Sequence, residues 1–160
     1  MQGKYTKKAQ EVLARAQEAA VTLGNKYVGT EHILLGLTLV QESVASKALE
    51  GQNVTYHQVM DRITAMQAGK TRLYIPVDFT PRAKRIVEFS VQEAARMGTN
   101  YVGTEHILIA LLRETDTVAI KILLGLGVNI QRLYEDILLM LGESESQPEG
   151  MKGMGARSEK

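Results

Sequence analysis

The sequence predicts an all-α protein in which one four-helix unit occurs twice. The first observation is an octamer, YVGTEHIL, that occupies residues 27–34 and returns unaltered at residues 101–108. The second is that the register holds at this offset of 74 without a gap from Tyr5 against Phe79 to Gln67 against Leu141, and 21 of the 63 aligned positions are identical. Such repetition indicates one structural unit written twice. We therefore expect eight helices, as two pseudo-twofold four-helix repeats packed into one body.

Capping residues and glycines divide the first unit into four helices. Small hydroxylated residues precede the helical apolar stripes, where their side chains can accept hydrogen bonds from free backbone N–H groups. Glycine follows three of the stripes, as is common just after a helix ends. The expected N-caps are Thr6, Thr30, Ser43 and Thr55, and the expected stops of the first, third and fourth helices are Gly24, Gly51 and Gly69.

The second unit carries the same signals 74 residues later. Pro81 follows the Thr80 cap at the first helical position, where its missing N–H is harmless. After Gly142 no helical stripe remains. The expected organisation is a domain over residues 1–142, with repeat one at 5–68, a linker at 69–78 and repeat two at 79–142, followed by a flexible tail or interdomain linker at 143–160.

Composition excludes several function classes. Nineteen basic and eighteen acidic residues give a formal charge of +1, so we expect neither a nucleic-acid nor a membrane partner. The sequence has no cysteine, which agrees with a reducing compartment and removes thiolate metal sites. No apolar leader is recognisable within the first thirty residues. The expectation is an unexported, cytoplasmic protein.

Motifs for catalysis or cofactors are only approximated. Gly69, Lys70 and Thr71 resemble the end of a phosphate-binding P-loop, but Thr64 stands where the first glycine should be. His32 and His106 each follow a glutamate, yet adjacent helical residues point about 100° apart and no second histidine follows one turn later. A role in the capping turn fits these histidines better than metal binding. We expect no catalytic residue, no metal and no cofactor in this chain.

The Gly-Thr-Glu start of two helices admits two interpretations. In the first, Thr30 and Thr104 cap their helices, and Glu31 and Glu105 favour the positive end of the helix dipole by about 0.3–1 kcal/mol. In the second, the carboxylates belong to a mixed site in which the starts of other helices receive an anion. Capping explains poorly why six consecutive residues are identical in both copies. The residues alone leave both interpretations open.

The paired YVGTEHIL motifs, the helix starts YTKKA at Tyr5 and FTPRAK at Phe79, and the 74-residue repeat resemble the double Clp N-terminal repeat, in the form found in the ClpC unfoldases of Gram-positive bacteria. The resemblance covers residues 1–142. It implies the recognition domain of a hexameric AAA+ unfoldase that feeds the ClpP peptidase. The ATPase modules of that family, which use ATP, are not in this sequence, so the resemblance implies a chain that is not itself an enzyme.

The resemblance also implies ligands. In the family the glutamate of each GTEH motif receives the guanidinium of phosphoarginine, which carries over to Glu31 and Glu105. The threonines at the helix starts carry over as Thr6 and Thr80, and the motif threonines as Thr30 and Thr104. The implied partners are phosphoarginine-tagged or unfolded client proteins and MecA-type adaptors. The alternative is a structural or docking domain that gates the ATPase ring without reading any mark.

Overall fold

A computed structural model describes residues 4–67 and 78–144, and this part of the chain folds into eight α-helices. The all-α prediction is therefore confirmed. The helices are α1 (Lys7–Thr22), α2 (Thr30–Leu39), α3 (Val44–Gly51), α4 (Tyr56–Met66), α5 (Pro81–Arg96), α6 (Thr104–Arg113), α7 (Val118–Gly125) and α8 (Ile130–Ser144).

Most helices begin at the predicted caps. The hydroxyl oxygen of Thr6 accepts a hydrogen bond from the backbone N–H of Ala9 at 3.0 Å, and that of Thr80 accepts one from Ala83 at 3.1 Å. Ser43, Thr55 and Thr117 cap their helices in the same way. Each cap satisfies a backbone donor that has no partner inside its own helix.

The caps of α2 and α6 differ from the prediction. Gly29 and Gly103 occupy the N-cap positions, and Thr30 and Thr104 are the first helical residues. The capping interaction comes from the third helical position, where His32 Nδ1 accepts a hydrogen bond from the Gly29 N–H at 2.8 Å. The prediction was wrong because a histidine at this position supplies the acceptor that a capping box normally takes from glutamate or glutamine.

The helix ends agree with the predicted boundaries in part. Gly24 and Gly98 have φ of 74° and 81°, a left-handed conformation that suits glycine just after a helix. Gly51, by contrast, is the last residue of α3, and the left-handed residue is Asn53 with φ of 62°. Helix α8 continues through Ser144, two residues beyond the expected boundary at 142. The expected stop at Gly69, the linker up to residue 77 and the tail from residue 145 lie outside the described residues.

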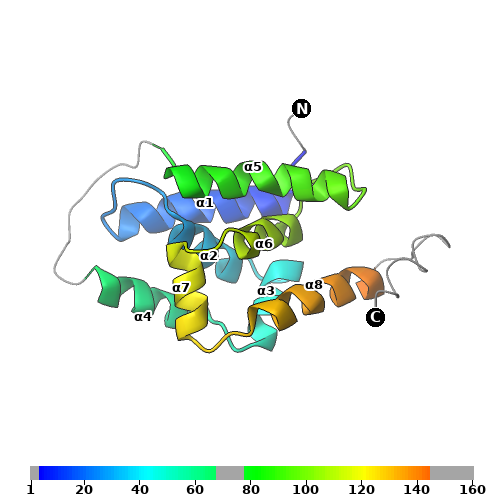
Figure 1. Ribbon diagram of the computed structural model, residues 1–160. Helices are drawn as coiled ribbons and strands as arrows, with labels where there is room; N and C mark the ends of the chain where they lie inside the picture. The colour runs from blue at the N-terminus through cyan, green and yellow to red at the C-terminus, as the bar shows by residue number, and fades with distance from the viewer. Residues whose placement is uncertain (1–3, 68–77, 145–160) are drawn as a thin grey trace.

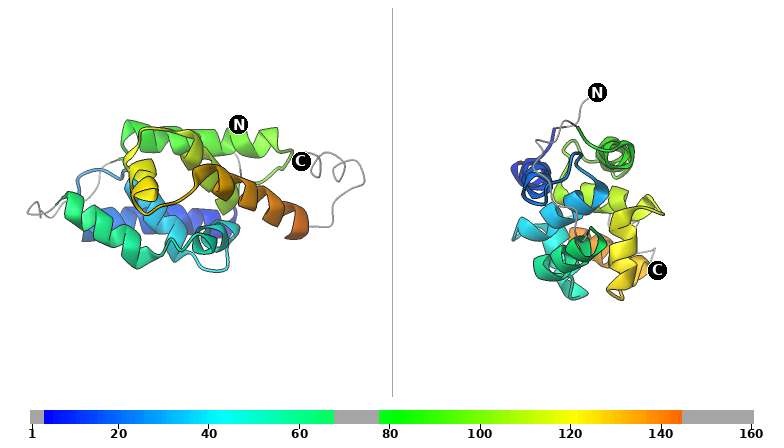
Figure 2. Two further views of the ribbon diagram at one scale, coloured as in Figure 1. Left: turned by 60° about the horizontal axis from the view of Figure 1, so that its bottom comes forward. Right: turned by 90° about the vertical axis from the view of Figure 1, so that its left-hand side faces the viewer.

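The two repeats pack on each other through equivalent helices. Helices α1 and α5 lie above α2 and α6 in Figure 1. Each contacts the second helix of its own repeat and the second helix of the other repeat, so that α1 packs against α2 and α6, and α5 against α6 and α2. The end-on view in Figure 2 shows α1 and α5 on one side of the molecule, with the other helices below them. Helix α2 contacts α7, and α3 contacts α6 and α8. The repeats therefore form one body, as predicted.

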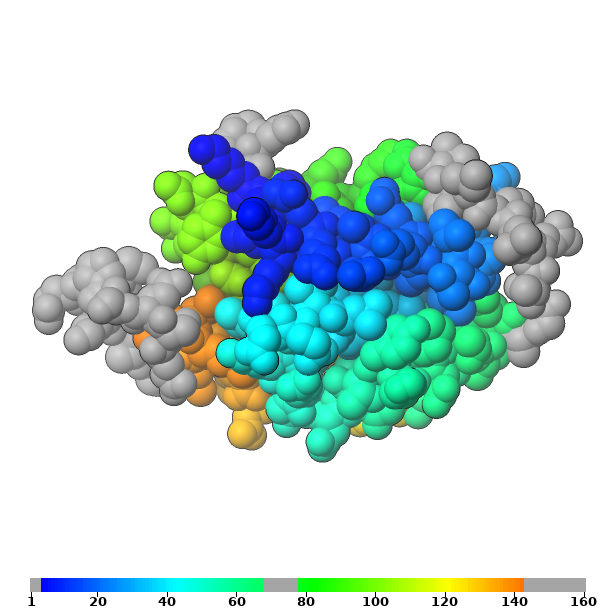
Figure 3. Space-filling view, turned by 180° about the vertical axis from the view of Figure 1, so that it is seen from behind, coloured from blue at the N-terminus to red at the C-terminus, as the bar shows by residue number. Residues whose placement is uncertain are grey.

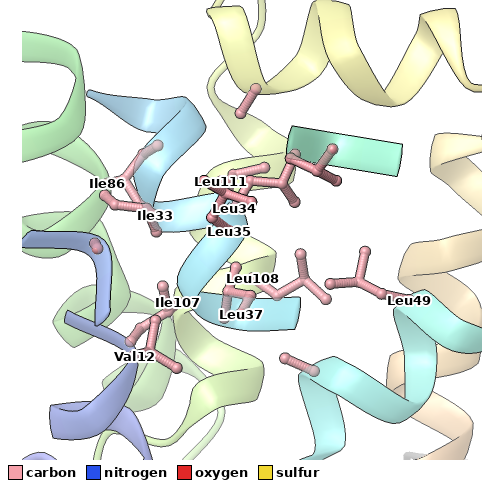
Figure 4. Packing of buried hydrophobic residues seen from close by; sticks show 14 of the residues in the cluster. Val12, Ile33, Leu34, Leu35, Leu37, Leu49, Ile86, Ile107, Leu108 and Leu111 are labelled. Atoms are coloured by element: carbon pink, nitrogen blue, oxygen red, sulfur yellow. The ribbon is translucent and has the colours of Figure 1, made fainter. Parts of the chain in front are cut away.

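One continuous core joins the repeats. Figure 4 shows Ile86 of α5 beside Ile33 of α2, and Val12 of α1 beside Ile107 of α6. Val12 and Ile86 are equivalent under the 74-residue offset, as are Ile33 and Ile107, so the two contacts are the same contact made in both directions. All four side chains are completely buried. Separating the repeats would expose this surface at a cost of about 1.5–3 kcal/mol per large side chain.

Two short backbone crossings reinforce the core. The Val102 N–H donates to Lys4 O at 2.7 Å and the Thr6 N–H donates to Val102 O at 2.9 Å. In the equivalent crossing the Val28 N–H donates to Asp78 O at 3.1 Å and the Thr80 N–H donates to Val28 O at 2.8 Å. The segment before α1 is thus held by the segment before α6, and the segment before α5 by the segment before α2.

Seen from behind in Figure 3, helices α1, α3 and α4 of repeat one make up most of the surface. Within residues 4–67 and 78–144, no helix is both long enough and apolar enough to cross a bilayer.

We predict that Gly36→Ala destabilises the protein. A Cβ at Gly36 in α2 would collide with the backbone carbonyl oxygen of Val12 in α1, so the two helices would have to move apart. We expect a loss of about 1–3 kcal/mol in the free energy of unfolding, measured by urea denaturation. Gly51→Ala is the matched control, because a Cβ there meets nothing within 4 Å, and it should leave stability unchanged or slightly raised. Equal stability of the two variants would contradict the close approach of α1 and α2.

Candidate functional site

Two equivalent surface cavities lie where the repeats meet. The first, of about 460 Å³, is lined by Glu31 and its neighbours at the start of α2, by Thr80 and Arg82 at the start of α5, and by Asp116, Thr117 and Val118 at the start of α7. We call it the Glu31 pocket. It takes its carboxylate wall from repeat one and its other walls from repeat two.

The second cavity, of about 360 Å³, reverses the contributions. Glu105 and Thr104 at the start of α6 face Thr6, Lys7 and Lys8 at the start of α1, and Glu42, Ser43 and Val44 before and at the start of α3. We call it the Glu105 pocket. The six residues predicted for binding thus divide into two composite sets: Glu31, Thr30 and Thr80 in one pocket, and Glu105, Thr104 and Thr6 in the other.

Each glutamate lies over the first turn of its own helix. A Cβ on Gly29 would lie 2.5 Å from Glu31 Oε1, and one on Gly103 would lie 2.6 Å from Glu105 Oε1. Only glycine therefore leaves room for the carboxylate in this position. Glu105 is 6% exposed and Glu31 is half-buried. Both carboxylates are held at a cavity wall, and Glu105 is the better shielded from water.

The environment of Glu31 favours its neutral form. Burial raises the pKa of Glu31 above its ordinary value, and a hydrogen bond from its own backbone N–H lowers it to a smaller extent. A cation that enters the pocket would stabilise the charged form of this carboxyl group, which burial disfavours. A guanidinium group supplies such a cation together with paired N–H donors.

The motif threonines carry hydrogen bonds between the repeats. Thr30 Oγ1 accepts from the backbone N–H of Ala119 in α7 at 3.1 Å, and Thr104 Oγ1 accepts from Ala45 in α3 at 3.3 Å. Both threonine residues are nearly inaccessible, at 4% and 3% exposure. Their observed role is to dock the start of a helix from the other repeat against the pocket, and contact with a ligand stays a prediction for them.

The helix starts opposite the glutamates favour an anion. Thr6 and Thr80 cap α1 and α5 at the pocket wall, and α3 and α7 begin at the same cavities. Backbone N–H groups and the positive end of the helix dipole make such starts suitable for phosphate or carboxylate. A carboxylate on one wall and helix starts on the other give each pocket two regions of opposite electrostatic preference.

Sequence reasoning missed the loops that precede α3 and α7. Arg82 Nη1 donates to Thr115 O at 2.9 Å and to Asp116 O at 3.3 Å, while Lys8 Nζ donates to Glu42 O at 2.6 Å. Glu42 and Asp116 both adopt left-handed backbone conformations, with φ of 63° and 66°. The equivalent caps Ser43 and Thr117 marked these helix starts in the sequence, but the repeat did not reveal that they face the glutamates.

The two motif histidines are structural. His106 Nδ1 accepts from the Gly103 N–H at 2.9 Å, as His32 does from Gly29. The acceptor role of Nδ1 assigns the proton to Nε2, which in His32 lies 2.8 Å from Asn25 Oδ1. In His106 the buried Nε2 has no hydrogen-bond partner among the described residues. Burial lowers the pKa of each histidine to about 4.

The described part of the chain contains no candidate metal-binding site. Residues 4–67 and 78–144 contain no group of three or more histidine or acidic side chains that could hold an ion. The P-loop-like residues 69–71 lie outside the described residues.

Comparison with known proteins identifies the repeat. The family model described as the Clp repeat (R) N-terminal domain matches residues 4–126 and again residues 78–156. The chaperone protein ClpB of Oceanobacillus iheyensis is 42% identical over 147 residues, which is 92% of this chain. The negative regulator of genetic competence ClpC/MecB of Bacillus subtilis is 40% identical over 146 residues, or 91% of this chain. The chain spans 18% of the length of each of these relatives.

Solved structures show the same fold. The N-terminal domain of the caseinolytic protease-associated chaperone ClpD from Arabidopsis thaliana has a TM-score of 0.74 at 24% identity, over 86% of this chain and 97% of that chain. A complex of the ClpV N-domain with a VipB peptide has a TM-score of 0.67 at 19% identity, over 88% of both chains. At these identities the likeness concerns the fold alone.

We predict that stability falls as the pH drops from 7.5 to 5. The two buried histidines have pKa values of about 4 in the folded protein, against an ordinary 6.5 when unfolded. Between these values the unfolded state binds more protons, so the free energy of unfolding decreases as the pH falls. Glu31 changes the free energy of unfolding in the opposite direction. Its pKa is raised in the folded protein, so the folded state binds this proton more readily than the unfolded state as the pH falls. We expect a net loss on the order of 1–3 kcal/mol in urea titrations.

His106→Gln separates this effect from other titrating groups. Glutamine keeps an acceptor for the Gly103 N–H but does not titrate, so the loss between pH 7.5 and 5 should shrink by about half. His57→Gln is the matched control, since it makes the same substitution at an exposed histidine on α4. A wild-type stability that stays constant or rises toward pH 5 would contradict the burial of neutral histidines.

Proposed function

The chain belongs to the Clp repeat N-terminal domain family, and we propose that it is the recognition domain of an ATP-dependent Clp unfoldase, binding proteins marked by phosphoarginine. The predicted family is confirmed by the match of its model to both repeats. In this proposal MecA-type adaptors and unfolded clients are further partners, and ATP hydrolysis and ClpP docking belong to parts of the parent protein outside this chain. We place the domain in the cytoplasm.

The observation that supports phosphoarginine is the division of each pocket into two walls. Glu31 stands on one wall, and Thr80 and the starts of α5 and α7 stand on the other. A carboxylate can accept two N–H bonds from a guanidinium, while helix N–H groups and a hydroxyl hold the phosphoryl group. Both ends of the ligand then meet groups of opposite charge or dipole. The Glu105 pocket repeats this arrangement with Thr6 and the starts of α1 and α3.

A purely structural domain is the competing function. Glu31 already accepts a hydrogen bond from its own backbone N–H, and Thr30 and Thr104 already join the repeats. If these interactions were the whole role of the motif, the pockets would bind no phosphoarginine and the domain would act as a spacer or gate on the ATPase ring. Titration of phosphoarginine by calorimetry decides between the two functions.

We predict that Glu31→Gln and Glu105→Gln each remove about one of two phosphoarginine equivalents and that the double variant binds none. Loss of the carboxylate charge removes a charge-assisted contact on the order of 1.5–3 kcal/mol, or roughly ten- to a hundredfold in affinity. If the glutamates interact only with the helix dipole, each substitution should lower the free energy of unfolding by at most about 1 kcal/mol and leave binding unchanged. The melting temperature should therefore move by only a few degrees.

Two controls accompany this titration. Glu50→Gln changes an exposed glutamate at the end of α3 that lines neither pocket, and it should bind like the wild type. Phosphoserine should bind poorly to the wild type, because its dianion would face the carboxylate with no cation between them. Unchanged phosphoarginine binding in a folded double variant would assign the glutamates to the helix dipole alone.

A further inference from the structure

The two pockets share most of their lining and differ in where their cations stand. Glycine, threonine and glutamate of the motif are identical in both, and Thr80 and Thr6 occupy equivalent positions with nearly identical backbones (φ −63° and −64°, ψ 161° and 163°). Taking phosphoarginine binding as proposed above, we infer that the Glu105 pocket is the tighter of the two sites and that Lys7 is the residue that makes it so.

Charge placement separates the pockets, although their charge totals are equal. The Glu31 pocket is lined by Lys26, Arg82, Glu31 and Asp116, and the Glu105 pocket by Lys7, Lys8, Glu42 and Glu105. Each therefore has two cations and two acids. In the Glu105 pocket both lysines belong to the start of α1, next to Thr6 and across the cavity from the motif glutamate.

In the Glu31 pocket the second cation stands on the opposite wall. Lys26 precedes Tyr27 in the segment that carries Glu31, and its Nζ lies 5.7 Å from the centre of the Tyr27 ring. An ammonium group on this wall repels the guanidinium end of the ligand and competes with it for the carboxylate. The equivalent residue in repeat two, Asn100, is neutral and does not line the Glu105 pocket.

The first residue of the facing helix adds a second difference. Lys7 is the first residue of α1, and its backbone N–H is one of the free donors at the start of that helix. The equivalent residue of α5 is Pro81, which has no N–H. At the start of its facing helix the Glu105 pocket therefore offers the phosphoryl group one more backbone donor than the Glu31 pocket, and two cationic side chains, Lys7 and Lys8, where the Glu31 pocket has Arg82 alone.

A separation of charge of this kind matches a ligand that is anionic at one end and cationic at the other. Phosphoarginine has this character, since the phosphoryl end meets Lys7, Lys8 and the start of α1 while the guanidinium end meets Glu105. The Glu31 pocket, with a cation on each wall, discriminates less between phosphoarginine and a simple anion such as inorganic phosphate.

Reciprocal exchange of the two residues tests the inference. Lys7→Pro is accepted by the fold, because proline suits the first helical position and Pro81 occupies the equivalent one. Glu31→Gln leaves only the Glu105 pocket competent, and Glu105→Gln leaves only the Glu31 pocket. Lys7→Pro is therefore combined with Glu31→Gln, and Pro81→Lys with Glu105→Gln. Phosphoarginine is titrated into each protein by calorimetry at low and moderate salt.

We expect phosphoarginine to bind the Glu31→Gln protein roughly three- to tenfold more tightly than the Glu105→Gln protein. Lys7→Pro in the first background should remove most of this advantage, leaving the part that comes from Lys26, and Pro81→Lys in the second should raise the affinity by a similar factor. The advantage should shrink as salt is added, because an exposed ammonium is screened. Lys121→Gln, on the exposed face of α7, is the control and should change neither affinity.

Three outcomes are distinguishable. Equal affinity in the two backgrounds, or tighter binding by the Glu31 pocket, overturns the inference and leaves the proposed function standing. Exchanges that leave a real difference unchanged overturn the role of Lys7. A wild-type protein that binds no phosphoarginine at either pocket overturns the proposed function itself. If Lys7→Pro fails to fold, Pro81→Lys carries the test alone.

Discussion

The reciprocal crossing between repeats is the constraint on which both pockets depend. Val28 and Val102 each exchange backbone hydrogen bonds with the segment that enters the first helix of the other repeat. These crossings set the start of α5 beside Glu31 and the start of α1 beside Glu105. Without them each glutamate would face solvent, and each helix start would lie apart from a carboxylate. Each pocket therefore belongs to the pair of repeats and to neither repeat alone.

A ligand bound in the Glu31 pocket would stabilise the contact between the two repeats. Thr30 holds the N–H of Ala119, and Arg82 holds the carbonyl groups just before α7, so three elements of the Glu31 pocket are already joined. A ligand that bridges Glu31 and Thr80 would add one more link across this seam. Binding to the folded state alone then raises stability by mass action, with no change of fold required.

Local chemistry was predictable and partner choice was not. The Thr6 and Thr80 caps were predicted because their partners lie three residues away, within the reach of a sequence pattern. Thr30 was assigned wrongly because His32 supplies the capping acceptor, and the hydrogen-bond partner of Thr30 itself, Ala119, is 89 residues distant. The 74-residue offset identifies which positions are equivalent, but equivalence does not say which positions touch. Glu31 faces Thr80 and not Thr6 because of the Val28 crossing and the packing of α5 against α2, and no spacing in the sequence records either of them.

The identity of the motif in both repeats can now be divided between packing and function. Valine forms the crossing, glycine leaves room for the carboxylate, threonine binds the opposite repeat, histidine accepts the N-cap N–H, and isoleucine fills the core. Each of these residues makes a structural interaction that most other side chains could not make in its place. The glutamate is different, because many first-turn residues would suit the helix dipole at a cost of about 1 kcal/mol or less. A half-buried carboxylate with a raised pKa, kept at a cavity wall as Glu31 is, opposes stability unless a cation pairs with it. Of the residues in the motif, the glutamate is therefore the one whose presence a ligand explains best.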